Sequence, residues 1–305
     1  MENLTRIEEV AQLREFIDLE LDADFLAQAS NRIYILDEKV DSSIRIRPRK
    51  SHKGTYGHAI IFAGSYGKMG AAVLSAKACL RSGVGLLTMA VPKCGYEIIQ
   101  ISVPEAMCLA DESEKFLFQL PDIKSYSAIG IGPGIGKGNS TAYLLKQLLV
   151  KAQRPLVLDA DAINILAEQK DLLELIPEGT ILTPHIKEFE RLVGTAKSIE
   201  ERYIKLQEFS MKYKCIVVLK DAYTCVSSSK GDLYFNSSGN QGMATGGSGD
   251  VLTGIITGLL AQGYQPLLAA LLGVFKHGVA GDIAARKKGF SAMIASDIVE
   301  RLHID

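Results

Sequence analysis

Residues 58–91 read HAIIFAGSYGKMGAAVLSAKACLRSGVGLLTMAV and contain the unit from which the fold is built. The apolar run His58–Ala63 predicts a short strand that ends in a turn at Gly64. Small and apolar residues at helical spacing predict a helix over Gly70–Ser82, and Leu86–Val91 predicts the next strand. Strands that alternate with helices in this way are typical of a mainly parallel sheet with helices on both faces.

The same alternation continues along the chain. Further strands are predicted at 128–131, 155–158, 180–182 and 215–219, with helices at 141–151 and 199–213. A hairpin is predicted over 223–235, and the last third is predicted to be helical at 249–261, 266–285 and 295–303. The sequence therefore predicts an α/β fold in which ligands bind outside the carboxyl ends of the strands.

Composition excludes several classes of protein. The 305 residues are 47% hydrophobic and 23% charged with a net charge of -1, which excludes a mainly disordered chain and gives no sign of a nucleic-acid or anionic-membrane partner. The five cysteines are scattered along the sequence, which is typical of buried free thiols in a reducing compartment. We therefore predict a cytoplasmic protein. We expect no signal peptide and no transmembrane helix.

The amino-acid composition of the N-terminal segment differs from that of the rest of the chain. Residues 1–35 are charge-rich, and residues 41–53 are basic and interrupted by Pro48. We therefore predict an N-terminal extension or linker over 1–50 and one three-layer α/β/α domain over 51–305.

Residues 240–250, NQGMATGGSGD, form the densest glycine cluster and lead directly into an apolar helix. Glycines allow backbone N–H groups to converge, and a helix N-terminus adds positive potential, so the segment is suited to a phosphate. Asp250 lies in the first turn of the helix and would face the same site. The alternative is an aspartate that only caps the helix after a flexible loop.

Two further glycine clusters, Gly132–Gly138 and Gly64–Gly70, each follow a strand and precede a helix. Each is either a tight turn or a place where a ligand approaches the backbone, and Ala71 would let a flat ligand reach the helix start. The chain contains neither GxxxxGK[ST] nor GxGxxG, which argues against P-loop and Rossmann dinucleotide sites.

Polar residues follow the predicted strands where each one ends. Asp159 and Asp161 follow one strand, and either of them could instead cap the next helix. His185 and Glu188 would share a face at the start of a helix, where Glu188 is suited to hold Mg²⁺ through water. The alternative for this pair is a capping box with Thr183 as the cap. A single crevice explains these strand ends together.

Lys220 follows another predicted strand, and Thr224 lies four residues further on. A lysine at a strand end is often only solvated, which is the alternative to a role in the same crevice.

Six motifs occur in an order that resembles one known family. They are SHKGTYGHAIIFAGSYGKMGAA (51–72), GIGPGIG (130–136), LVLDADAIN (156–164), LTPHIKEFERL (182–192), VVLKDAYT (217–224) and GNQGMATGGSGDVLTG (239–254). The chain is similar over 51–303 to the ADP- or ATP-dependent NAD(P)H-hydrate dehydratases of the ribokinase-like superfamily. The resemblance implies a ribokinase-like three-layer α/β/α domain with a mainly parallel central sheet.

The resemblance also implies an activity: repair of the S form of hydrated NADH or NADPH. Family members phosphorylate the ring hydroxyl with ATP or ADP, and phosphate then leaves. Mg²⁺, a cytoplasmic homotetramer and no nucleic-acid or membrane partner are implied as well. The residues that match the family's functional positions are Asp250 as base and substrate contact, Ala71, Gly134 and His185 at the substrate, Lys220, Asp221, Ala222, Tyr223, Thr224, Gly247 and Gly249 at the nucleotide, and Glu188 at the metal.

Two points depart from the family pattern or lie outside it. Asp221 stands where relatives often have glycine, which affects the local conformation more than the role. The segment Glu15–Tyr34 resembles the tail of the epimerase domain that precedes the dehydratase in bifunctional relatives, so we expect no epimerase activity from this chain.

Two alternatives remain open on the sequence. One is a small-molecule kinase of the same fold, of the hydroxymethylpyrimidine or hydroxyethylthiazole type. The other is a regulatory nucleotide-binding module, against which Asp250 and Lys220 argue. The choice between ATP and ADP, and between the two hydrated cofactors, is not determined by these motifs.

Overall fold

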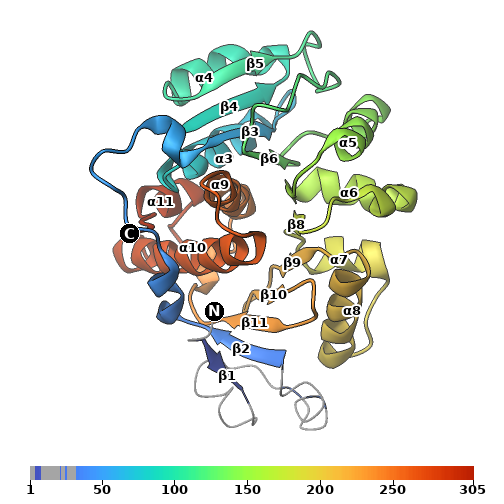
Figure 1. Ribbon diagram of the computed structural model, residues 1–305, viewed down its shortest axis with the longest axis vertical. Coiled ribbons are helices and arrows are strands. Elements are labelled where there is room, and N and C mark those ends of the chain that lie inside the picture. Colours follow the sequence, from blue (N-terminus) through green and yellow to red (C-terminus); the bar gives the residue numbers. More distant parts are fainter. Residues whose placement is uncertain (1–3, 8–20, 22–24, 26–31) are drawn as a thin grey trace.

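One mixed sheet runs through the protein (Figure 1). The computed structural model describes residues 4–7, 21, 25 and 32–305, and in them the sheet has eleven strands in the order β1-β2-β11-β10-β9-β8-β7-β6-β3-β4-β5. The strands are β1 (Thr5–Arg6), β2 (Ile33–Leu36), β3 (His58–Phe62), β4 (Leu86–Val91), β5 (Met107–Ala110), β6 (Ala128–Ile131), β7 (Leu156–Leu158), β8 (Ile181–Leu182), β9 (Ile216–Leu219), β10 (Cys225–Ser227) and β11 (Leu233–Asn236).

Seven neighbouring strands of the sheet are all parallel, as the alternating pattern predicts: β9, β8, β7, β6, β3, β4 and β5. β10 is antiparallel to both β9 and β11, because a tight hairpin joins β10 to β11. β2 then adds to β11 in parallel. Seven neighbouring parallel strands therefore bring their carboxyl ends to one edge of the sheet, where ligands bind in folds of this kind.

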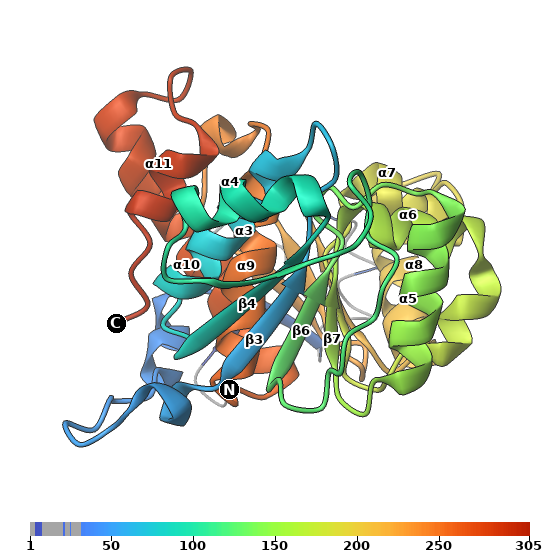
Figure 2. The ribbon, with the colours of Figure 1, turned by 90° about the horizontal axis from the view of Figure 1, so that it is seen from above.

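Helices cover both faces of the sheet, which confirms the predicted three-layer α/β/α architecture. In Figure 2, α3 and α9–α11 lie on one side of the strands and α5–α8 on the other. The helices are α3 (Met69–Arg81), α4 (Tyr96–Ser102), α5 (Asn139–Lys151), α6 (Ala160–Glu168), α7 (Ile186–Val193), α8 (Ile199–Lys212), α9 (Ser248–Ala261), α10 (Pro266–Lys288) and α11 (Ala295–Glu300). Short 3₁₀ helices span Glu38–Ser43, Lys53–Tyr56, Lys93–Gly95, Lys170–Leu175 and Gln241–Met243.

Helix α9 is buried from Val251 to its end because it is wedged between α3, α10 and the sheet. Gly254 allows the close approach of α3: a Cβ built there would lie 2.2 Å from the Ser75 carbonyl oxygen. Helix α10 is long and apolar enough, by length and composition, to cross a membrane, but 72% of that stretch is buried inside the protein. This is the burial expected of a core helix, and it includes Lys276 and His277.

The region predicted as an N-terminal extension contributes to the sheet and to the core. β2 pairs with β11 over Ile33–Leu36, and Val40 in the following 3₁₀ helix is buried. Asp41 and Lys276 of α10 form an ion pair of 2.9 Å, which joins this region to the second half of the chain. Most of Glu15–Tyr34, which resembles an epimerase tail, lies outside the described residues.

The predicted strands and helices of the central domain are present, and β4 and β6 have the predicted bounds. β1, β2, α4 and β5 were not predicted, and α6 was expected only as the helix that Asp159 or Asp161 could cap. β5 lies at the sheet edge, where its apolar residues Met107 and Leu109 are exposed. The strand therefore lacks the alternation of buried apolar and exposed polar residues from which a strand could be predicted. α6 begins directly after β7 through Ala160, whose φ of 47° allows a sharp turn without a glycine.

The contact between α3 and α9 gives a prediction about stability. Gly254→Ala should lower the free energy of unfolding by about 1–3 kcal/mol, because the added methyl group collides with the α3 backbone. Gly70→Ala in α3 is the matched control, since no atom lies within 4 Å of the Cβ position there, and it should change stability by less than about 1 kcal/mol. Urea unfolding of both variants tests this, and equal midpoints would contradict the close approach.

Candidate active site

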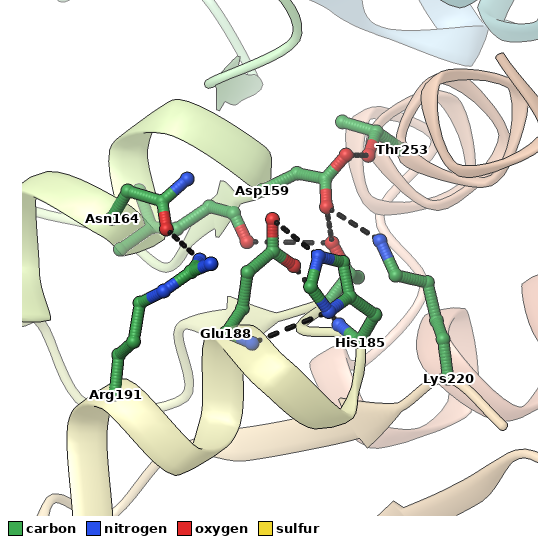
Figure 3. A network of polar contacts seen from close by, with 9 residues as sticks. Asp159, Asn164, His185, Glu188, Arg191, Lys220 and Thr253 are labelled. Atoms are coloured by element: carbon green, nitrogen blue, oxygen red, sulfur yellow. Dashed lines mark hydrogen bonds and ion pairs between the residues drawn. The ribbon is translucent and has the colours of Figure 1, made fainter. Parts of the chain in front are cut away.

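The carboxylate of Asp159 connects three strand ends and a helix (Figure 3). Asp159 follows β7 and is 1% exposed. Its Oδ1 accepts hydrogen bonds from Thr183 Oγ1 at 2.8 Å and from Lys220 Nζ at 2.9 Å. Its Oδ2 accepts a hydrogen bond from Thr253 Oγ1 of α9 at 2.7 Å. One buried carboxylate therefore fixes the ends of β7, β8 and β9 against the first turns of α9.

The parallel ladder explains why these residues meet. Leu158 of β7 pairs with Leu182 of β8, and the next residues along the two strands are Asp159 and Thr183. Lys220 follows β9, which is hydrogen-bonded to β8, and its N–H donates to the Pro184 carbonyl at 2.8 Å. Thr253 comes from far along the chain, so only the tertiary structure brings it to this point.

His185 and Glu188 form a capping box at the start of α7. The His185 backbone N–H donates to Glu188 Oε2 at 2.9 Å, and the Glu188 N–H donates to His185 Nδ1 at 3.3 Å. The capping alternative weighed from the sequence is therefore present, but the cap is His185 and not Thr183, whose hydroxyl is bonded to Asp159. Burial lowers the pKa of His185, and Lys220 and Arg191 lower it further while Glu188 opposes them. His185 is thus neutral near pH 7.

Asp250 lies in the first turn of α9, as predicted, with an unusual pKa. Burial raises the pKa of its carboxyl to about 7, the negative charge of Asp159 adds to this effect, Lys220 opposes it, and Asp161 adds a smaller rise. A carboxylate with a pKa near the working pH is well matched to accept a proton. Asp250 is therefore the strongest candidate for a general base in the described part of the chain.

The glycine-rich loop before α9 lies close to the Lys220 ammonium group. Gly247 precedes the helix with a φ of 92°, a left-handed conformation that favours glycine. A Cβ built on Gly249 would lie 3.0 Å from Lys220 Nζ. Backbone N–H groups, a helix N-terminus and an ammonium group thus converge where the sequence predicts a phosphate.

Helix α10 anchors this loop through residues that the sequence analysis did not single out. Asp282 accepts hydrogen bonds from the Gly239 N–H at 3.0 Å and from Asn240 Nδ2 at 2.8 Å. His277 Nε2 lies 3.3 Å from Ser248 Oγ. Burial, with a contribution from Lys220, lowers the pKa of His277 to about 4, so this ring is neutral. These residues lie within a long apolar helix, where the sequence carries no signal of a site.

Ala71 and Gly134 lie side by side on the neighbouring loops. A Cβ built on Gly134, whose φ is 64°, would lie 3.2 Å from Ala71 Cβ. Ser65 Oγ donates to the Gly134 carbonyl at 2.7 Å and holds the two loops together. The structure therefore brings the two small residues predicted at the substrate to one place.

Asp161, which the sequence places two residues after Asp159, joins the same two loops. Its Oδ2 accepts a hydrogen bond from the Gly136 N–H at 2.8 Å and pairs with Lys68 Nζ at 3.5 Å. These contacts favour a structural role, and Asp250 remains the better candidate.

The turn between β9 and β10 carries the segment predicted to bind nucleotide, Lys220–Thr224. The Ala222 N–H donates to Asp221 Oδ1 at 2.8 Å, and Thr224 Oγ1 donates to the Asp221 carbonyl at 3.4 Å. Asp221, the departure from the family pattern, therefore stabilises this turn. Tyr223 is half-buried against the core. The nucleotide roles of these residues stay predictions.

Glu188, the predicted metal position, has few other metal-binding side chains around it. The described residues contain no group of three or more His, Cys, Asp or Glu side chains that could hold a metal ion. Glu188 is buried and both of its oxygens contact His185. This arrangement fits an ion that is held by phosphates and water, with Glu188 in contact only through water.

A separate cavity of about 810 Å³ lies between β5, residues 117–121 and α5. Its only charged lining residue is Asp111. That carboxylate accepts three backbone N–H groups, from Ser113, Phe118 and Gln119, at 2.8–3.0 Å. The cavity therefore offers no group for acid–base chemistry, and the reactive groups lie instead around Asp250.

Residues 59–303, which include all of these loops, match the protein-family model described as NAD(P)H-hydrate dehydratase. The chain belongs to the NAD(P)H-hydrate dehydratase family. It is 40% identical over 271 residues to the bifunctional NAD(P)H-hydrate repair enzyme of Moorella thermoacetica, covering 86% of this chain and 51% of that protein. The chain thus spans about half the length of such bifunctional members of the family.

A shorter member of the NAD(P)H-hydrate dehydratase family matches along most of its length. The ADP-dependent (S)-NAD(P)H-hydrate dehydratase of Neisseria meningitidis is 36% identical over 261 residues, covering 83% of this chain and 86% of that protein.

A solved structure of the same family has the same fold. The ADP/ATP-dependent NAD(P)H-hydrate dehydratase of Bacillus subtilis, co-crystallised with ATP and Mg²⁺, has a TM-score of 0.79 and 30% identity over 88% of this chain and 95% of its own. A hydroxyethylthiazole kinase from Pyrococcus horikoshii is more distant, with a TM-score of 0.56 and 15% identity over 80% of this chain and 87% of its own, and it shares the fold alone. The predicted ribokinase-like α/β fold is confirmed.

The raised pKa of Asp250 gives a prediction about stability. In the unfolded chain this carboxyl loses its proton near its ordinary pKa of about 3.9, whereas in the folded protein it does so only at about 7. Asp250 therefore destabilises the fold increasingly as the pH rises from about 4 to 7, and Asn at this position does not. Asp250→Asn should raise the Tm at pH 8 by about 2 °C or more, with a smaller difference at pH 4.5. Equal or lower Tm values of the variant at pH 8 would contradict the burial of this charge.

Proposed function

We propose that this protein dehydrates the S form of hydrated NADH or NADPH in a reaction driven by ATP or ADP, and so repairs damaged nicotinamide cofactor. The observation that carries the proposal is Asp250, with a pKa of about 7, beside Lys220 and the glycine loop at the start of α9. A base next to a phosphate site is what phosphorylation of a hydroxyl group requires. The family to which the chain belongs supports this substrate.

The proposed reaction has two steps. Asp250 takes the proton of the ring hydroxyl while that oxygen attacks the terminal phosphorus of the nucleotide, which forms a phosphate ester and ADP from ATP, or AMP from ADP. The electron pair of the ring nitrogen then helps to expel inorganic phosphate, and loss of a ring proton restores the double bond of NADH or NADPH. Phosphate is a far better leaving group than hydroxide, which explains the need for nucleotide.

Lys220 and the loop that contains Gly247 and Gly249 would stabilise the charge on the phosphoryl group in transit. The turn Asp221–Thr224 would hold the rest of the nucleotide. Mg²⁺, when bound with the nucleotide, supplies charge neutralisation on the phosphates, and Glu188 would contact it through water. His185, which is neutral and lies at the start of α7, would offer a ring nitrogen to the hydrated cofactor.

Ala71 and Gly134 would let the ring of the hydrated cofactor lie flat against the two loops. A larger side chain at either position would fill the space between the two loops, since even a methyl group on Gly134 would contact the Ala71 side chain.

We also propose a cytoplasmic homotetramer without a nucleic-acid or membrane partner. All five cysteines are free thiols, which suits a reducing compartment. Light scattering of the purified protein would measure the number of subunits.

The proposed activity has a direct test. Hydrated NADH incubated with the protein and ATP or ADP should regain the near-ultraviolet absorbance of NADH, and phosphate should appear in equal amount. Asp250→Asn should keep the fold and the nucleotide affinity but lose about 10²–10⁴-fold in turnover, because the amide cannot accept the proton.

Two outcomes would contradict this assignment. A stable phosphorylated product without recovery of NADH would instead indicate a kinase that stops after the first step. Turnover of Asp250→Asn above about a third of the wild-type value would show that another group is the base.

The nucleotide position gives a separate prediction. ADP or ATP should raise the Tm of the wild-type protein by mass action. Gly249→Val should remove that rise, because its side chain enters the space beside Lys220 Nζ. Gly138→Val is the control, since the Cβ position at Gly138 is open and its φ is -64°. An unchanged rise in Gly249→Val would place the phosphates elsewhere.

A further inference from the structure

We propose that Asp159 is the positioning residue of this site: its carboxylate holds the Lys220 ammonium against Gly249 and fixes the start of α9 relative to the strand ends. The inference rests on the function proposed above. It concerns a residue that is too deeply buried, at 1% exposure, to touch either substrate itself.

The contacts of Asp159 are too specific for a simple helix cap. The residue occupies the N-cap position of α6, yet its side chain makes no capping hydrogen bond there. Its oxygens instead accept hydrogen bonds from Lys220, Thr183 and Thr253, which come from three other elements. An aspartate at the N-cap usually accepts a hydrogen bond from its own helix. The Asp159 side chain does not, and binds Lys220 and Thr253 of α9 instead.

The backbone of Asp159 is fixed as firmly as its side chain. Gly132 in the loop after β6 lies so close that a Cβ there would be 1.9 Å from the Asp159 carbonyl oxygen. The Asp159 N–H donates to the Ile131 carbonyl at 3.1 Å. The backbone that carries the carboxylate is therefore held in place, and the hydrogen bonds from Lys220, Thr183 and Thr253 orient the carboxylate itself.

Lys220 needs such a partner. A lysine side chain has four rotatable bonds and loses more entropy than most when it is held in one place. Its Nζ lies 2.9 Å from Asp159 Oδ1 and 3.0 Å from the Cβ position of Gly249. Burial alone would lower the pKa of Lys220, but Asp159 and then Glu188 reverse this effect and the pKa is raised overall. Asp159 therefore keeps the ammonium both charged and aimed at the loop.

Asp159 also acts on Asp250 through its charge. The charged groups that face Asp250 are Asp159 at the end of β7, Lys220 at the end of β9 and Asp161 in α6, and Asp161 is itself paired with Lys68 of the β3–α3 loop. His277 of α10 is neutral near pH 7. After burial, repulsion by Asp159 is the largest effect that raises the pKa of Asp250. Without this charge the effect of burial would remain, but Lys220 would no longer be opposed by Asp159, so the pKa of Asp250 would be lower than in the wild-type protein.

The test is Asp159→Asn in the 305-residue chain, with Thr253→Val as the matched control. Asp159→Asn should lower kcat for hydrated NADH by about 100-fold, as expected when a reacting group is displaced. The Kd for ADP, measured by calorimetry, should stay within about threefold because Lys220 remains present. The acid limb of the pH profile of kcat, where turnover falls because Asp250 takes up a proton, should move to lower pH. Thr253→Val removes a hydrogen bond but no charge and should leave the acid limb in place.

A second pair of variants covers the case in which Asp159→Asn leaves the half-buried Lys220 without its partner and does not fold. Lys220→Met leaves Asp159 its hydrogen bonds from Thr183 and Thr253 and lets its carboxyl take up a proton, and the double variant Asp159→Asn/Lys220→Met removes both charges, so both should fold. If Asp159 acts through Lys220, the double variant should be no slower than Lys220→Met alone when both are assayed at a pH where Asp250 is fully ionised, whereas independent roles would multiply the two losses.

Each result decides a different question. An unmoved acid limb in Asp159→Asn, or multiplied losses in the double variant, would overturn the positioning role. Failure of the wild-type protein to repair hydrated NADH would instead reject the proposed function, whatever the variants do.

Discussion

The ion pair between Asp159 and Lys220 is the interaction on which the site depends. A buried carboxylate is costly unless it is paired and hydrogen-bonded, and here the partners come from β8, β9 and α9. Because all of them must reach one carboxylate, the sheet register and the position of α9 are fixed together. The charges that the proposed phosphate chemistry would use therefore also hold the strand ends in place.

Helix α9 connects the core to this chemistry. It approaches α3 so closely at Gly254 that no side chain fits there, and its whole length after Asp250 is buried. The close packing leaves the first turn of the helix under the glycine loop, where burial gives Asp250 its pKa of about 7. An ionised carboxylate in this position lowers the free energy of unfolding above neutral pH. Groups held in pre-organised sites commonly reduce stability in this way.

Much of the fold could be predicted because the strands β4 and β6 are continuous apolar runs closed by proline or glycine, and such runs have few other structures open to them. The edge strand β5 and helix α4 were missed because their side chains are partly exposed and show no clear period. β2 was missed because its place is decided by β11, which lies nearly 200 residues further along the chain. In the site, Asp250, Lys220 and Gly249 stood out from local pattern, whereas His277 and Asp282 did not.

The sequence by itself determined the α/β class, the parallel strands and the glycine loops at their ends, because these follow from short-range periodicity and from the backbone freedom of glycine. It also identified Asp250 as the acidic residue in the first turn of a helix that follows such a loop. Only the tertiary structure decided that Asp159 turns away from its own helix to bind Lys220 and Thr253. The physical reason is that pairing of a buried charge depends on which donors meet in space, and those donors lie 24, 61 and 94 residues away in the chain.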